Sequence, residues 1–124
     1  MKLLGLVLSL LTTATLAAPR EIVISTEKIG ESVHWVPQRV EVFPGEEIKF
    51  VIKHELQGGF DFHGFFVPQL KIQKQVNRNK AEELTVKIPK KMKLGEYPMG
   101  CHFHPKHVPA TLVVKTPAPD SKAN

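Results

Sequence analysis

Apolar and polar side chains alternate along several segments of this chain with a period of two, which is the period of a β-strand that buries one face. Within residues 47–54, Ile48, Phe50 and Ile52 share one side of the backbone, opposite two lysines and a glutamate. Four further segments show this alternation or a short β-branched run: residues 21–26, 38–43, 82–88 and 110–115. All five are predicted to be strands. The side chains predicted to face inward in three of them are Val40, Val42, Leu84, Val86, Ile88, Leu112 and Val114.

Turn residues punctuate these strands, and no strong helical pattern competes with them. Pro44-Gly45 separates two of the predicted strands, and the chain holds 10 Pro and 8 Gly. No segment after residue 18 carries an apolar stripe with a 3.6-residue period, although residues 67–79 have room for a short helical turn. We therefore predict an all-β fold of antiparallel strands, a Greek-key β-sandwich or barrel of about seven or eight strands.

The length of 124 residues fits one domain. Apolar residues make up 42% and charged residues 23% of the chain, which is close to the globular average and excludes a disordered, collagen-like or coiled-coil protein. The predicted domain covers residues 18–115. Residues 116–124 are polar and contain proline, and they are expected to form a flexible tail.

Residues 1–17 have the three-part pattern of a secretory signal peptide: a positive start at Lys2, an apolar run over residues 3–11 and a small-residue end. The alternative is a buried N-terminal helix. The apolar run is too short to span a bilayer, which takes about 20 residues. Cleavage is expected after Ala17, so the mature protein is expected in the periplasm or outside the cell, without a membrane span.

The net charge is +5, from 17 Lys and Arg against 12 Asp and Glu. Loss of residues 1–17 would remove one lysine and leave 16 basic against 12 acidic residues, a net charge of +4. These charges are spread along the chain, and the longest basic run is Lys90-Lys91. No nucleic-acid partner is therefore expected, because nucleic-acid binding needs clustered basic residues. A modest positive charge favours acidic protein partners.

The candidate chemistry is concentrated in residues 97–108, which read YPMGCHFHPKHV and lie between a strand that ends near Cys101 and the last predicted strand. This segment holds the only Cys and three of the six His. A single Cys excludes an intramolecular disulfide and a zinc site built from several thiolates. Three roles stay open for Cys101: a disulfide between two copies, an inert core thiol, or a metal ligand.

Cys101, His104 and His107 follow one another at intervals of three residues, so a turn can bring their side chains to one ion. A thiolate with imidazoles suits copper or zinc far better than Mg²⁺ or Ca²⁺. A further ligand is expected from elsewhere in the chain, and His63, which stands among aromatic residues beside a glycine, is the best candidate. The predicted ligands are His63, Cys101, His104 and His107. Met99 is the alternative to His107.

The remaining histidines are not expected to bind the metal. His34 and His54 are expected at the surface or as supporting residues around the ligands, and His102 is expected to point elsewhere. Trp35 is expected to pack in the core. Four aromatic residues near the predicted ligands are expected to exclude water from the site: Phe62, Phe65, Phe66 and Phe103.

These features resemble the cupredoxins, the single-domain type 1 copper proteins, over residues 22–115. The resemblance includes the turn at Pro44-Gly45-Glu46, the His-Gly-Phe step at His63, the Gly-x-Tyr strand at residues 95–97 and the loop that begins at Cys101. The spacing from Cys101 to His104 is similar to the short loop of amicyanin. The resemblance implies a cofactor of one copper ion per chain, with zinc as the substitute.

The resemblance also implies a role for each ligand. Two imidazoles and one thiolate, from His63, His104 and Cys101, take the equatorial places. His107 takes the axial place, where the family usually has Met. Because imidazole is a stronger donor than thioether, it is expected to lower the reduction potential and to give a green or red site, similar to the red-copper branch, nitrosocyanin. A single dominant absorption band at about 600 nm, as in a trigonal thiolate site, would count against His107 as the axial ligand.

Three functions fit such a site. The leading expectation is an electron carrier that exchanges single electrons with a redox partner protein. The first alternative is a periplasmic copper carrier or buffer that serves a copper-accepting protein. The second is a small red-copper redox enzyme, which would bind azide or NO directly at the metal. An electron carrier is favoured over an enzyme.

Overall fold

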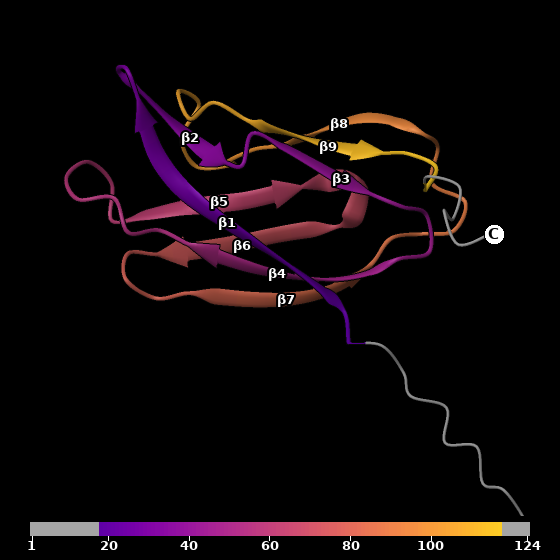
Figure 1. Cartoon of the computed structure of the whole chain (residues 1–124). Coiled ribbons are helices and arrows are strands. Elements are labelled where there is room, and N and C mark those ends of the chain that lie inside the picture. Colours follow the sequence, from indigo (N-terminus) through magenta and orange to yellow (C-terminus); the bar gives the residue numbers. More distant parts are fainter. Residues whose placement is uncertain (1–17, 118–124) are drawn as a thin grey trace, which may run out of the picture.

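The computed structural model describes residues 18–117, which form nine β-strands and a short 3-10 helix (Figure 1). In chain order the strands are β1 Arg20–Ile29, β2 Ser32–Val36, β3 Arg39–Val42, β4 Glu47–Lys53, β5 Phe62–Val67, β6 Ile72–Asn77, β7 Glu82–Lys87, β8 Gly95–Met99 and β9 Ala110–Val114. The helix η1, Pro68–Leu70, connects β5 to β6. The predicted all-β fold is confirmed.

The strands form a sandwich of two layers. One sheet has the order β2-β1-β4-β7, and the other layer consists of the sheet β3-β9-β8 and the hairpin β5-β6. Phe66 and Gly100 join the two parts of this second layer, because the backbone N–H of each donates to the carbonyl of the other at 2.9 Å. This junction places β5 beside the residue that precedes Cys101.

Two strand pairs are parallel, so the prediction of antiparallel strands was wrong for these pairs. β1 runs parallel to β4, with Ile24 opposite Ile52, and β3 runs parallel to β9, with Val42 opposite Val114. The other pairs within the sheets are antiparallel. Alternation reports which face of a strand is buried but contains no information on the direction of the neighbouring strand, which depends on how the chain crosses between the sheets.

Two backbone hydrogen bonds tie strand ends together around the predicted ligands. The N–H of Val108 donates to the carbonyl of Val33 at 2.8 Å and links the segment before β9 to β2. The N–H of Asn79 donates to the carbonyl of His54 at 2.8 Å and links the end of β6 to the end of β4. At these two points backbone hydrogen bonds join the two layers, as they do in a closed barrel.

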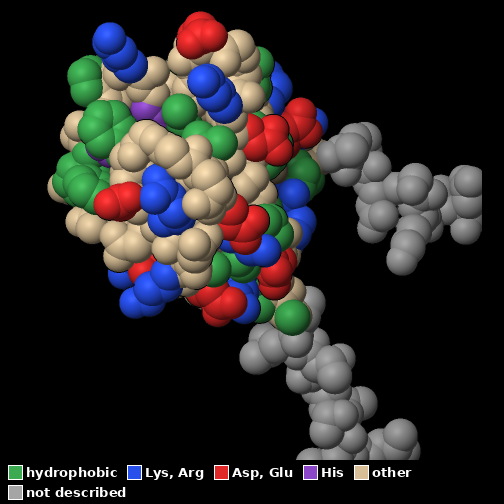
Figure 2. Space-filling view, turned by 90° about the vertical axis from the view of Figure 1, so that its left-hand side faces the viewer, with side chains coloured by type: hydrophobic (Ala, Val, Ile, Leu, Met, Phe, Trp, Pro, Cys, Tyr) green, Lys and Arg blue, Asp and Glu red, His purple; other side chains and the backbone are tan. Residues whose placement is uncertain are grey.

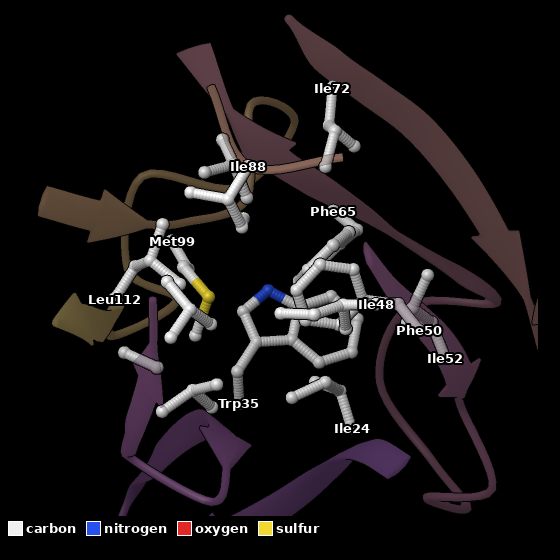
Figure 3. Close-up of a cluster of buried hydrophobic side chains, with 14 of the residues drawn as sticks. Ile24, Trp35, Ile48, Phe50, Ile52, Phe65, Ile72, Ile88, Met99 and Leu112 are labelled. Atoms are coloured by element: carbon white, nitrogen blue, oxygen red, sulfur yellow. The ribbon is translucent and has the colours of Figure 1, made fainter. Parts of the chain in front are cut away.

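Trp35 lies at the centre of the core, where it is fully buried (Figure 3). Its indole N–H donates to the carbonyl of Gly100 at 3.1 Å, so its polar atom is satisfied. The packing role predicted for Trp35 is confirmed. Of the predicted inward residues, those in the buried core are Val40, Val42, Ile48, Phe50, Ile52, Ile88, Leu112 and Val114. Leu84 and Val86 are partly buried and pack against it.

Three strands were not predicted: β2, β5 and β6. In β6 only Ile72 and Val76 are buried, and the polar residues between them hide the alternation. β5 is nearly continuously buried, so it lacks the polar face on which the prediction relied. The helical turn expected within residues 67–79 is present only as η1, and most of the remaining residues belong to β6.

The predicted signal peptide, residues 1–17, and residues 118–124 of the predicted tail lie outside the described part of the chain. Within residues 18–117, no helix is long and apolar enough to cross a membrane.

Candidate metal centre

The predicted ligands gather at one end of the sandwich. The β1–β2 turn, the β4–β5 loop and the β8–β9 loop reach this end (Figure 1), and together they line a cavity of about 360 Å³. His63 lies on β5, whereas Cys101, His104 and His107 lie in the β8–β9 loop. A turn in which the His107 N–H donates to the His104 carbonyl at 3.0 Å folds this loop back on itself.

Three donor atoms form a compact cluster. Cys101 Sγ lies 3.6 Å from His104 Nδ1 and 4.0 Å from His63 Nδ1, and the two nitrogens are 3.2 Å apart. Two donors bound to one ion at about 2.0 to 2.3 Å lie roughly 3.2 to 3.8 Å apart at tetrahedral or trigonal angles. The spacing therefore fits a single ion with little rearrangement, and a thiol with imidazoles is a donor set suited to copper.

His107 approaches this cluster from the side of His63. Its Nδ1 lies 3.1 Å from His63 Nδ1, and its side chain is buried. The donor atoms of His63, Cys101 and His104 all lie within 4.8 Å of one another, and His107 is not part of this group. Met99 packs in the hydrophobic core near Trp35 (Figure 3). Of the two candidates for the fourth position, His107 lies 3.1 Å from a predicted ligand, whereas Met99 belongs to the core cluster.

The thiol of Cys101 has one directed backbone partner. The N–H of Gly64 donates to Sγ at 3.1 Å, which fixes the position of the sulfur and offsets negative charge on it. Gly64 also permits close packing, because a Cβ at this position would lie 2.3 Å from Nδ1 of His102 and 3.1 Å from the Phe103 ring. The His-Gly-Phe step thus brings the β8–β9 loop against β5.

Replacement of Gly64 by alanine is expected to displace His102 and lengthen the contact between the Gly64 N–H and the sulfur. The cost in unfolding free energy is expected to be about 1 to 3 kcal/mol, as for other overpacked sites. Gly100→Ala is the control, because a Cβ there meets only Pro109, at 3.7 Å. Urea unfolding of both metal-free variants measures the difference, and equal stability of the two would contradict this packing argument.

Burial keeps the imidazoles neutral, as metal ligands must be. Desolvation, with smaller contributions from the nearby His107, His54 and His104, lowers the pKa of His63 from 6.5 to about 3. Desolvation also lowers the pKa of His107 to about 4, with a smaller contribution from His104. The pKa of His104 is lowered by the same cause. At neutral pH the three nitrogens therefore have lone pairs for an ion.

These shifts predict that the metal-free protein loses stability in acid. The unfolded chain binds protons on these histidines below about pH 6.5, whereas the folded chain resists protonation of His63 and His107 down to about pH 3 and pH 4. Stability should therefore fall as the pH drops from 6.5 towards 4, by at most roughly 1.4 kcal/mol per pH unit for each histidine. Urea unfolding across this range measures the slope. His63→Gln should reduce the slope, and an unchanged slope would contradict the assignment.

Of the two roles expected for His54, at the surface or as a supporting residue, its burial excludes the first. His54 is buried, its Nδ1 lies 2.8 Å from Thr26 Oγ1, and its Nε2 lies 2.9 Å from the Phe60 carbonyl. The ring of His54 meets that of His63 edge-on, with centroids 4.6 Å apart. In the sequence, His54 stands directly after an alternating strand. A polar side chain that is buried there needs hydrogen-bond partners.

The aromatic shell differs in part from the prediction. Phe65 belongs to the core, and Phe103 packs mainly on His102, with ring centroids 4.0 Å apart. The ring that covers His104 is Phe60, which stacks on it with centroids 3.8 Å apart and planes 17° from parallel. Figure 2 shows hydrophobic side chains gathered around a small exposed area of histidine at this end of the molecule.

Comparison with known proteins gives one match to a family. The family model described as "Cupredoxin-like domain" matches residues 2–114. No curated protein sequence matches the chain.

Several solved structures share the fold. The metal binding domain of the Cu(I) exporting P-type ATPase of Streptococcus pneumoniae D39 is 14% identical, with a TM-score of 0.61 over 82% of this chain and 92% of that chain. Auracyanin A, a "blue" copper protein from Chloroflexus aurantiacus, is 16% identical, with a TM-score of 0.57 over 79% and 100%. A chain of a heme-copper terminal oxidase dimer is 10% identical, with a TM-score of 0.55 over 77% of this chain. This chain spans 65% of the length of that oxidase chain.

Proposed function

Because this chain belongs to the cupredoxin-like domain family, we propose that it is an extracytoplasmic mononuclear copper protein that carries single electrons. The observation that carries the proposal is the convergence of one thiol and three imidazoles. Cys101 Sγ lies 3.6 Å from His104 Nδ1, and His63 Nδ1 lies within 3.2 Å of both other imidazole nitrogens. A thiolate with neutral imidazoles suits copper or zinc, and two imidazoles with one thiolate is the ligand set of copper electron-transfer sites.

In this proposal the residues have distinct roles. His63, Cys101 and His104 hold the ion, and His107 is the fourth ligand in the place where cupredoxins usually have Met. The Cys101–His104 spacing resembles the amicyanin loop. Because His107 adds an imidazole, we expect a green or red site, as in the nitrosocyanin branch. Zinc is the alternative metal, because it accepts the same four ligands.

The protein environment suits transfer of one electron. When bound, copper supplies the one-electron couple. The neutral, buried His63 and His107 hold their ring positions without proton uptake at neutral pH, which limits rearrangement. His104 lies under the partly exposed Phe60 ring, so its imidazole offers a short path from the site to a partner at the surface.

Copper loading with optical and EPR spectroscopy tests the proposal. One equivalent of Cu(II) should give a thiolate-to-copper charge-transfer band, and ascorbate should bleach it reversibly. Electron self-exchange, measured by NMR line broadening in mixtures of oxidised and reduced protein, should be fast. Protein purified from its own compartment with zinc alone, although copper was available, would contradict the electron-carrier function.

Copper carriage is the second candidate, and one structural observation favours it. The cavity of about 360 Å³ is lined by His63, His104 and His107, with Glu31 and Lys106 among its other residues. A copper-accepting group therefore has an approach to the imidazoles. Transfer of copper to an acceptor protein that outpaces electron self-exchange would favour this function and identify the partner as a copper acceptor.

The proposed location rests on residues 1–17, whose pattern is that of a signal peptide. Mass spectrometry of the protein exported by its own host should find an N-terminus at Ala18. An intact N-terminus on protein that remains in the cytoplasm would contradict the location without affecting the metal site.

A further inference from the structure

We propose that Phe60 is a cap over the His104 imidazole, that Arg78 positions this cap, and that the cap limits how fast solutes reach the metal centre. The part of this inference that concerns metal exchange rests on the proposed function. The part that concerns access to His104 does not, because it applies equally to the metal-free protein.

The first observation is the unequal exposure of the two stacked rings. Phe60 is 59% exposed, although it is a large apolar residue, whereas His104 beneath it is only 9% exposed. The rings are nearly parallel, with centroids 3.8 Å apart. One face of Phe60 therefore covers His104, and the other faces solvent.

The second observation is the way in which Arg78 holds the loop that carries Phe60. Its guanidinium donates to the carbonyls of Leu56, Gly58 and Phe60, each at 3.0 Å, and to a carboxylate oxygen of Asp61 at 2.7 Å. The backbone N–H of Arg78 donates to the carbonyl of Asp61 at 2.8 Å. The side chain of Arg78, directly after β6, thus fixes most of the β4–β5 loop. Arginine suits this role because its planar guanidinium holds several N–H donors in fixed directions.

The backbone of this loop has the features of a fixed support. Gly58 and Gly59 have φ angles of 78° and 67°, a conformation that favours glycine and turns the chain before Phe60. The carbonyl of Phe60 accepts from Arg78 and lies 2.9 Å from His54 Nε2. The exposed ring therefore stands on an anchored backbone, which explains how it keeps its place without burial.

The third observation is that Phe60 lines three cavities. It lines the cavity of about 360 Å³ that reaches His63, His104 and His107. It also lines one of about 550 Å³ beside Phe103 and His104, and one of about 350 Å³ beside Gly58 and His63. Removal of the ring would enlarge all three cavities, each of which is also lined by His63 or His104.

Phe60→Ala tests the cap, and Phe103→Ala is the matched control. Phe103 also lines the cavity of about 550 Å³, but its ring packs closest to His102 and its centroid lies 6.3 Å from that of His104. In the metal-free proteins, acylation of His104 by diethyl pyrocarbonate, located by tandem mass spectrometry, should be roughly two- to tenfold faster in Phe60→Ala, the range that an aromatic stack allows. Phe103→Ala and Phe60→Tyr should stay near wild type. Acylation of His34 in the same molecules is the internal reference.

In the copper-loaded proteins, removal of Cu(I) by bathocuproine disulfonate should show the same order of rates. Arg78→Lys keeps the charge but loses the fork, so its rates should lie between those of wild type and Phe60→Ala. Far-UV circular dichroism confirms that each variant is folded.

Equal acylation of His104 in wild type and Phe60→Ala would overturn the cap. Wild-type rates in folded Arg78→Lys would overturn the positioning role. Faster acylation in variants that bind no copper would uphold the cap and count against the proposed function.

Discussion

Copper-loaded protein in which Cys101 is replaced by serine is expected to lose its visible thiolate-to-copper absorption completely. Cys101 is the only cysteine in the chain, so no other thiolate can replace it. A serine oxygen is a harder ligand and binds copper weakly in such a site. Optical titration with Cu(II), followed by EPR of the titrated sample, measures the loss.

Met99→Leu is the matched control for this prediction, because it removes the sulfur of a fully buried residue that lies two positions before Cys101. This variant should keep the absorption band and its position. A shifted band in Met99→Leu would instead assign the fourth position to the thioether. A band that survives in Cys101→Ser would exclude the thiolate as a ligand.

Replacement of His107 by methionine is expected to change the colour of the site towards blue and to raise its reduction potential. The imidazole whose Nδ1 lies 3.1 Å from His63 Nδ1 would be exchanged for a thioether, which favours Cu(II) less. Each tenfold change in the relative affinity for Cu(I) and Cu(II) corresponds to about 59 mV for one electron, and we expect at least one such step. Spectroelectrochemistry measures both changes.

A second variant shows whether a change in colour or potential comes from loss of a ligand or only from a thioether placed in the loop. His102→Met places a thioether in the same loop, at a residue whose ring packs on Phe66 and Phe103, and should leave colour and potential nearly unchanged. Identical spectra of wild type and His107→Met would mean that the site has three protein ligands.

Strands with one solvent-facing side could be predicted because their polar residues mark the period. Glu47–Lys53 is such a case, because the charged Glu47, Lys49 and Lys53 alternate with buried apolar residues and only Val51 interrupts the pattern. Phe62–Val67 is buried along most of its length, and its sequence FHGFFV shows aromatic residues without a period. A pattern of burial also gives no direction, which is why the parallel pairs were missed.

The donor residues of the candidate site could be predicted because their chemistry is rare in the chain. A single Cys with three neighbouring His in one short loop restricts the alternatives, and the structure brings His63 to within hydrogen-bond range of His104 and His107. The support of the site could not be predicted in the same way. Arg78 acts through backbone carbonyls, which leave no signature in the sequence.

The arrangement explains how a β-sandwich holds the donor residues of the candidate site close together. Cys101 directly follows Gly100, which forms a backbone bridge with Phe66 of β5. Gly64 on β5 also donates its N–H to the sulfur at 3.1 Å. The thiol and His63 are thus fixed relative to each other by sheet geometry, although 38 residues separate them. Cys101 lies in the β8–β9 loop directly after the Phe66–Gly100 bridge, so its position depends less on the rest of the loop than those of His104 and His107 do.

A crystal structure of the copper-loaded protein, with anomalous scattering recorded at the copper edge, tests the central claim most directly. We expect a single metal peak at about 2.0 to 2.3 Å from Cys101 Sγ and from Nδ1 of His63 and His104. A peak bound only by residues of the β8–β9 loop, with the His63 nitrogen beyond bonding distance, would contradict the account.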